Sequence, residues 1–156
     1  DDPSRALLEP QEAAERVAAA RAAIDATGQP FVLTARAECY LSGHPEPFKE
    51  SMKRIHLYRE AGADCLYVPG IADPDEIREL VVEAGRPINI LARLGAHPLT
   101  FDDLRELGVR RISVGSGLGR HAFKAYERAA KAMLEEGRFD FMDDTLSVGE
   151  LNQLFD

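Results

Sequence analysis

Short apolar runs alternate with helical segments along the chain, and this alternation constrains the fold more than any other feature of the sequence. The apolar runs start near residues 31, 64, 88 and 110, and a segment with helical spacing precedes the first run and follows each of the four. Parallel strands need a helix between them, because the chain must return to the edge where the previous strand began. The sequence therefore predicts a parallel α/β sheet with right-handed crossovers.

Local signals set several of the expected boundaries. Residues 10–28 place apolar side chains at helical intervals between a proline and a glycine. Residues 73–76, Asp-Pro-Asp-Glu, predict a helix start with a capping aspartate, a proline in the first turn and a capping-box glutamate. Thr100 predicts the start of a short helix, and residues 147–150 contain a capping box that predicts a last one.

Two further segments carry specific expectations. The run PFVLTA (30–35) is apolar without alternation, which predicts a strand buried on both faces. The segment GSGLGR (115–120) predicts a glycine-rich turn that leads into a long helix from His121.

A closed barrel and an open doubly wound sheet both fit this order of elements. No GxGxxG follows the first strand, so the sequence does not favour the dinucleotide-binding form of the open sheet. Four units are half of a (βα)8 barrel, and half a barrel leaves two unpaired edges and an uncovered apolar face. We therefore expect residues 1–138 to be the second half of a TIM (βα)8 barrel, with an extra helical segment at 139–156. Strands from an N-terminal half absent from this sequence, or from a second copy, would complete it.

Composition excludes some classes of function. The chain carries 19 basic and 27 acidic residues, a net charge of −8, and its positive charges are scattered, so we expect no nucleic-acid partner. No apolar run approaches the roughly 18 to 20 residues that span a bilayer, and the first residues lack the pattern of a signal peptide, so we expect no membrane association. Cys39 and Cys65 have no CxxC spacing, which is typical of a reducing compartment, and we expect a cytoplasmic protein.

Arg36 and Glu38 are the leading candidates for chemistry, since the loops after parallel strands form the site in such folds. A guanidinium at a strand's carboxyl end suits bidentate capture of a carboxylate, phosphonate or phosphate. Glu38 could orient Arg36, hold a metal-bound water or transfer a proton. Alternation points both side chains the same way, so a simple structural ion pair is the competing interpretation.

Three other positions are candidates for substrate binding. Asn89 lies in an apolar run, so its amide needs a hydrogen-bond partner, which is either backbone or substrate. Ser116 and Gly117 enter a helix through a glycine-rich turn, which exposes backbone N–H groups to an anion, although glycines also serve a tight turn. His44 and His97 are weaker candidates in loops, and no histidine spacing supports a zinc site.

Several segments together resemble the second half of proteins in the isocitrate lyase / phosphoenolpyruvate mutase superfamily. The likeness covers nearly the whole chain, and its specificity comes from the ordered set rather than from any one segment. The segments are FVLTARAECYL, YREAGADCLYVPG, PINILARLGA, ELGVRRISVGSGL and TLSVGELNQLF.

The resemblance implies an enzyme that makes or breaks C–C or P–C bonds of small 2-oxo acids, phosphonates or hydroxy carboxylates. It implies an enolate-type intermediate held by Mg²⁺, with the metal ligands in a first half that this sequence does not contain. Arg36 matches the arginine of the family's Ala-Arg-Thr-Asp segment, which grips the substrate's acidic group. The last helix of the family commonly packs on a neighbouring subunit, so residues 139–156 would form such an arm in a homodimer or homotetramer.

The chain departs from the family pattern at two places, which keeps other functions open. Residues 35–38 read Ala-Arg-Ala-Glu, and Pro69-Gly70 replaces the Pro-Glu of the methylisocitrate-lyase branch. One alternative is a noncatalytic barrel that keeps an anion-binding cup. Another is a different barrel enzyme that binds a phosphorylated substrate at the last strand-to-helix loop.

Overall fold

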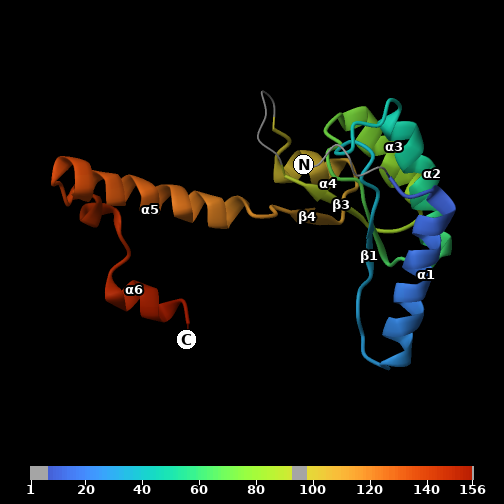
Figure 1. Ribbon diagram of the computed structural model, residues 1–156, viewed down its shortest axis with the longest axis horizontal. Helices are drawn as coiled ribbons and strands as arrows, with labels where there is room; N and C mark the ends of the chain where they lie inside the picture. Colours follow the sequence, from blue (N-terminus) through green and yellow to red (C-terminus); the bar gives the residue numbers. More distant parts are fainter. Residues whose placement is uncertain (1–6, 93–97, 156) are drawn as a thin grey trace. The chain divides into compact units, whose positions relative to one another are not determined.

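The computed structural model describes residues 7–92 and 98–155. Helices and strands alternate along the chain (Figure 1). The elements are α1 (Pro10–Ala26), β1 (Thr34–Arg36), α2 (Pro47–Glu60), β2 (Cys65–Tyr67), α3 (Pro74–Ala84), β3 (Ile88–Leu91), α4 (Phe101–Glu106), β4 (Arg111–Ser113), α5 (Gly117–Glu136), the 3-10 helix η1 (Asp140–Asp144) and α6 (Val148–Gln153).

The four strands form one parallel sheet in the order β1-β2-β3-β4, which confirms the predicted βα architecture. The strand register aligns one residue from each strand in a row across the sheet. Arg36 pairs with Tyr67, Tyr67 with Asn89, and Asn89 with Arg111. Residues paired in a parallel sheet lie on the same face, so these four side chains share one face.

The helices cover the opposite face of the sheet. Figure 1 shows α1, α2 and α3 gathered on one side, and the strand side chains that point there are buried. Those residues are Ala35, Leu66, Ile88 and Ile90, and they join Ile55, Ile77, Leu80 and Leu104 from the helices in one core. Within the described residues of the first unit, the face opposite these helices carries the row that starts at Arg36, so the expectation of an apolar uncovered face is wrong. Its side chains are largely polar, as in the lining of a site rather than of a core.

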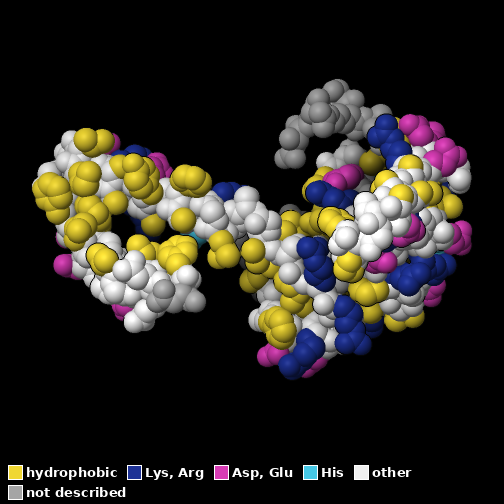
Figure 2. Space-filling model, turned by 90° about the horizontal axis from the view of Figure 1, so that it is seen from below, with side chains coloured by type: hydrophobic (Ala, Val, Ile, Leu, Met, Phe, Trp, Pro, Cys, Tyr) yellow, Lys and Arg dark blue, Asp and Glu magenta, His cyan; other side chains and the backbone are white. Residues whose placement is uncertain are grey.

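The chain divides into two compact units, Asp1–Val114 and Gly115–Asp156. The second unit consists of α5, η1 and α6, and Figure 2 shows hydrophobic side chains spread over it. Phe123 and Tyr126 are each 75% exposed, and Leu134 is 84% exposed. The boundary expected at residue 138 stays a prediction. Among the described residues, no helix has the length and apolar character needed to cross a bilayer.

Two local predictions need correction. β1 begins at Thr34, so Phe31 and Val32 lie before the strand rather than in it, and both are about two-thirds exposed. α5 begins at Gly117 rather than at His121, since the N–H of Arg120 already donates to the Ser116 carbonyl over 2.8 Å.

Candidate functional site

Arg36 is the last residue of β1 and stands on the face of the sheet without helices. Its guanidinium carbon lies 5.1 Å from the centroid of the Tyr67 ring, on the neighbouring strand. A guanidinium over an aromatic face is attracted by the ring's negative π surface. The neighbouring strand therefore helps to hold this cation in place.

Glu38 forms an ion pair with Arg36, with 2.7 Å between Nη2 and Oε1. The two side chains are 52% and 39% exposed, so water screens the attraction and the pair adds little to stability. The carboxylate and the Tyr67 ring both contact the guanidinium and favour this position for it. The remaining N–H groups of Arg36 can bind an oxyanion. A role for Glu38 in proton transfer stays a prediction.

Asn89 lies in the middle of the sheet with its side chain fully buried. Its Nδ2 donates to Ser113 Oγ over 3.0 Å, and its Oδ1 accepts from Arg111 Nη1 over 3.0 Å. Among the described residues, the partners of the Asn89 amide are thus two side chains of β4. A contact of Asn89 with substrate stays a prediction. Arg111 escaped the sequence analysis because only the strand register places it beside Asn89.

Ser116 and Gly117 lie at the start of α5, in the second compact unit. Ser116 occupies the N-cap position, but its side chain accepts no capping hydrogen bond. Both residues are exposed. Their proposed contact with an anion stays a prediction.

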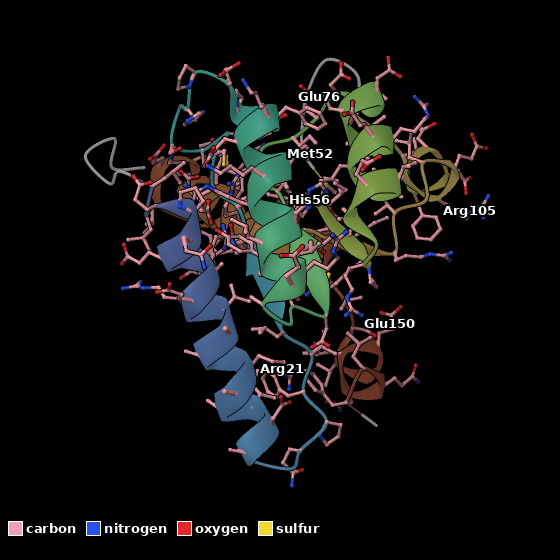
Figure 3. All side chains as sticks on the ribbon, turned by 90° about the vertical axis from the view of Figure 1, so that its right-hand side faces the viewer. Arg21, Met52, His56, Glu76, Arg105 and Glu150 are labelled. Atoms are coloured by element: carbon pink, nitrogen blue, oxygen red, sulfur yellow. The ribbon has the colours of Figure 1, made fainter. Side chains whose placement is uncertain are left out.

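Gly70 ends the segment after β2 with a φ of 100°, in the region that favours glycine. A Cβ at this position would lie 2.6 Å from the Cβ of Tyr40, which belongs to the loop between β1 and α2. The hydroxyl of Tyr40 in turn donates to Glu76 Oε2 over 2.6 Å, at the start of α3 (Figure 3). The carboxylate that the methylisocitrate-lyase branch carries here would not fit without movement of the Tyr40 loop.

This contact also corrects the predicted capping box of α3. Asp73 accepts hydrogen bonds from the N–H groups of Asp75 and Glu76, as the sequence predicted. The Glu76 side chain bonds to Tyr40 instead of returning to the cap. A long-range partner has replaced the local one.

Cys39 and His44 lie in the loop between β1 and α2 and do not belong to the row of Arg36. Cys39 is fully buried, and burial raises the pKa of its thiol, which disfavours the thiolate that a nucleophile needs. His44 Nδ1 accepts from the N–H of Glu46 and lines a hollow of ≈ 470 Å³ between the segment before α1 and the loop after β1. His97 lies outside the described residues.

The implied Mg²⁺ can be tested against the side chains present. Within residues 7–92 and 98–155, no group of three His, Cys, Asp or Glu residues is placed to hold a metal ion. The described part of the chain therefore does not fit Mg²⁺, and we derive no step through it.

Comparisons with known proteins agree with this architecture. The chain is 39% identical to a candidate lyase/mutase from Burkholderia cenocepacia J2315, over 99% of this chain and 55% of that one, with a TM-score of 0.90. It is 26% identical to 2,3-dimethylmalate lyase, a PEP mutase/isocitrate lyase superfamily member, over 85% of this chain and 46% of that one, with a TM-score of 0.74. It is 30% identical to the petal death protein of Dianthus caryophyllus, over 96% of this chain and 46% of the relative.

The chain spans about half the length of these relatives. The sequence model of the phosphoenolpyruvate phosphomutase family matches residues 1–134. Together with the parallel sheet and the helices on one of its faces, this match shows that the chain belongs to the phosphoenolpyruvate phosphomutase family, within the isocitrate lyase / PEP mutase superfamily.

Proposed function

We propose that the complete protein makes or breaks a C–C or P–C bond of a small 2-oxo acid, phosphonate or hydroxy carboxylate through an enolate-type intermediate. Family membership supports the reaction class. The main support for the proposal is the position of the Arg36 guanidinium. It lies at the carboxyl end of β1, over the Tyr67 ring and beside Glu38.

In this proposal Arg36 binds the acidic group of the substrate and holds it against the uncovered face of the sheet. Glu38 and Tyr67 keep the guanidinium in position before the substrate arrives, so binding requires little reorganisation. Donors fixed in advance stabilise negative charge that develops during the reaction.

The cofactor and assembly proposed for the complete protein rest on the family resemblance, and the proposed location rests on the spacing of its two cysteines. We propose Mg²⁺ as the cofactor, a homodimer or homotetramer as the assembly, and the cytoplasm as the location.

The proposal is tested by turnover of a panel of 2-oxo acids, phosphonates and hydroxy carboxylates by the complete protein. We expect Arg36→Ala to lower kcat/KM by about 100-fold or more and Arg36→Lys to restore part of it, because lysine keeps the charge but not the planar fork. Arg105→Ala is the matched control, since Arg105 lies exposed on α4, where its partner is Asp102 (Figure 3). Wild-type kcat/KM in Arg36→Ala would contradict the proposal.

The same panel separates the alternative functions. Binding of an anion that depends on Arg36, without turnover of any substrate, would favour a noncatalytic barrel. Phosphate binding that depends on Ser116 and Gly117, but not on Arg36, would favour a site for a phosphorylated substrate at the start of α5.

A further inference from the structure

Three side chains on the uncovered face of the sheet form one connected group, which we call the β3–β4 cluster: Asn89, Arg111 and Ser113. Arg111 is the register partner of Asn89, and Ser113 lies two residues further along β4, on the same face. Asn89 bonds to both of them over 3.0 Å. The family resemblance gave no role to Arg111 or Ser113.

The chemistry of arginine fixes the orientation of the Asn89 amide. A guanidinium has only donors, so the atom that faces Arg111 must be the oxygen Oδ1. The amide nitrogen Nδ2 therefore faces Ser113 and donates to its Oγ. Because the amide is fully buried and both its ends are engaged, Asn89 can act on a ligand only through these two neighbours.

The two neighbours keep hydrogen-bonding capacity that the cluster does not use. Arg111 is exposed and gives one N–H to Asn89, and it forms no ion pair with any residue of the described chain. Within the described residues, no other acceptor binds its remaining four N–H donors. Ser113 Oγ accepts from Asn89, which leaves the hydroxyl proton free to donate.

We propose that Arg111 and Ser113 bind oxygen atoms of the anionic substrate on the same face as Arg36, and that Asn89 is the positioning residue that aims them. This inference rests on the proposed function for its substrate class, an oxyanion of the carboxylate or phosphonate type. Arg36 and Arg111 occupy one register row, three strand spacings or roughly 14 Å apart along the sheet. A fixed guanidinium without a carboxylate partner is suited to such an anion.

The test measures binding of oxalate, a small dianionic probe, to the complete protein by calorimetry. We expect Arg111→Gln to weaken oxalate binding by about 10- to 100-fold, because glutamine keeps a donor for Asn89 but loses the charge. Ser113→Ala should weaken binding by less. Arg110→Ala is the matched control, because Arg110 is the preceding residue, is also exposed and alternates to the other face.

The role of Asn89 is tested by a double-mutant cycle and by kinetics. Asn89→Ala should weaken oxalate binding in the wild type but cause much less further loss in Arg111→Gln, since its effect passes through Arg111. In turnover assays it should raise KM more than it lowers kcat. Circular dichroism and thermal melting establish that each variant is folded. Equal additive losses in both backgrounds would make Asn89 a structural residue only.

The outcomes separate this inference from the proposed function. Oxalate binding that is unchanged in Arg111→Gln but lost in Arg36→Ala would overturn the inference and leave the proposed function standing. Oxalate binding that depends on Arg111, in a protein that turns over no substrate, would overturn the proposed catalysis and support the anion site.

Discussion

Gly70 is a position where backbone conformation and packing both disfavour any residue with a Cβ. Its φ of 100° is strained for any residue with a Cβ, and such a Cβ would lie 2.6 Å from that of Tyr40. Gly43 has a φ of 71° but no atom within 4 Å of its virtual Cβ. Substitution at Gly43 therefore measures the cost of backbone strain, and substitution at Gly70 measures backbone strain plus the steric overlap with Tyr40.

We expect Gly70→Ala to lower the free energy of unfolding by about 3 kcal/mol, because strain and overlap add. Gly43→Ala should cost about 1 to 2 kcal/mol, from backbone strain alone. Urea unfolding of both variants measures the difference. Equal losses in the two variants would show that the Tyr40 loop moves aside freely.

At the scale of elements, α3 is held at its first turn by one local and one distant interaction. Asp73 caps the helix from its own chain segment, whereas Tyr40 reaches Glu76 from the loop after β1. α2 offers a contrast, because Glu46 stands at its N-cap position without a capping hydrogen bond from its side chain.

Removal of the α3 cap should therefore cost more than removal of the residue at the start of α2. We expect Asp73→Ala to lower the free energy of unfolding by about 1 kcal/mol, since two backbone N–H groups lose their acceptor. Glu46→Ala should change it by much less. Chemical denaturation compares the two, and a similar loss in both would rule out a special contribution of the cap.

The contact between Tyr40 and Glu76 should make the free energy of unfolding depend on pH in the alkaline range. Burial of the phenol is the main reason why the pKa of Tyr40 is raised, and its hydrogen bond to Glu76 raises the pKa further. The pKa of Tyr40 is higher in the folded protein than in the unfolded chain, where it is about 10. The contribution of Tyr40 to the free energy of unfolding is therefore complete below about pH 10 and is lost as pH rises toward the folded pKa. The free energy of unfolding should thus fall less steeply above pH 10 in Tyr40→Phe than in the wild type.

Denaturation curves at several pH values between 8 and 11 would measure this slope. Glu76→Gln provides the control, since it keeps an acceptor for the phenol but removes the negative charge, and it should flatten the slope in part. A slope in Tyr40→Phe identical to that of the wild type would refute the coupling.

At the scale of the whole molecule, the described part of the chain pairs no further strand with β1 or β4, and one face of the sheet carries the largely polar row of Arg36. The described residues hold no cluster that could bind a metal ion. The Mg²⁺ proposed for the complete protein would therefore need ligands from outside the described residues.

We accordingly expect removal of divalent metal with EDTA to abolish turnover of the complete protein and addition of Mg²⁺ to restore it. The helical signal in circular dichroism, measured on the same samples, should stay unchanged. Full turnover after exhaustive chelation would contradict the proposed cofactor.

Much of the fold could be predicted because its signals are local. The proline and aspartate at residues 73–74 set the start of α3, and residues 147–150 form the expected capping box of α6. Alternation of strands and helices predicted the parallel sheet, since a parallel connection physically requires a crossover. The start of β1 was misjudged because the exposure of Phe31 and Val32 depends on which neighbours the strand has.

The sequence by itself determined the order of elements, most of their boundaries and the place of Arg36 at the end of a strand. Only the tertiary structure decided which side chains meet: Arg36 over Tyr67, Asn89 between Arg111 and Ser113, and Tyr40 against Gly70. The physical reason is strand register, because a shift of one residue turns every side chain to the other face, and register arises from packing between segments far apart in the chain.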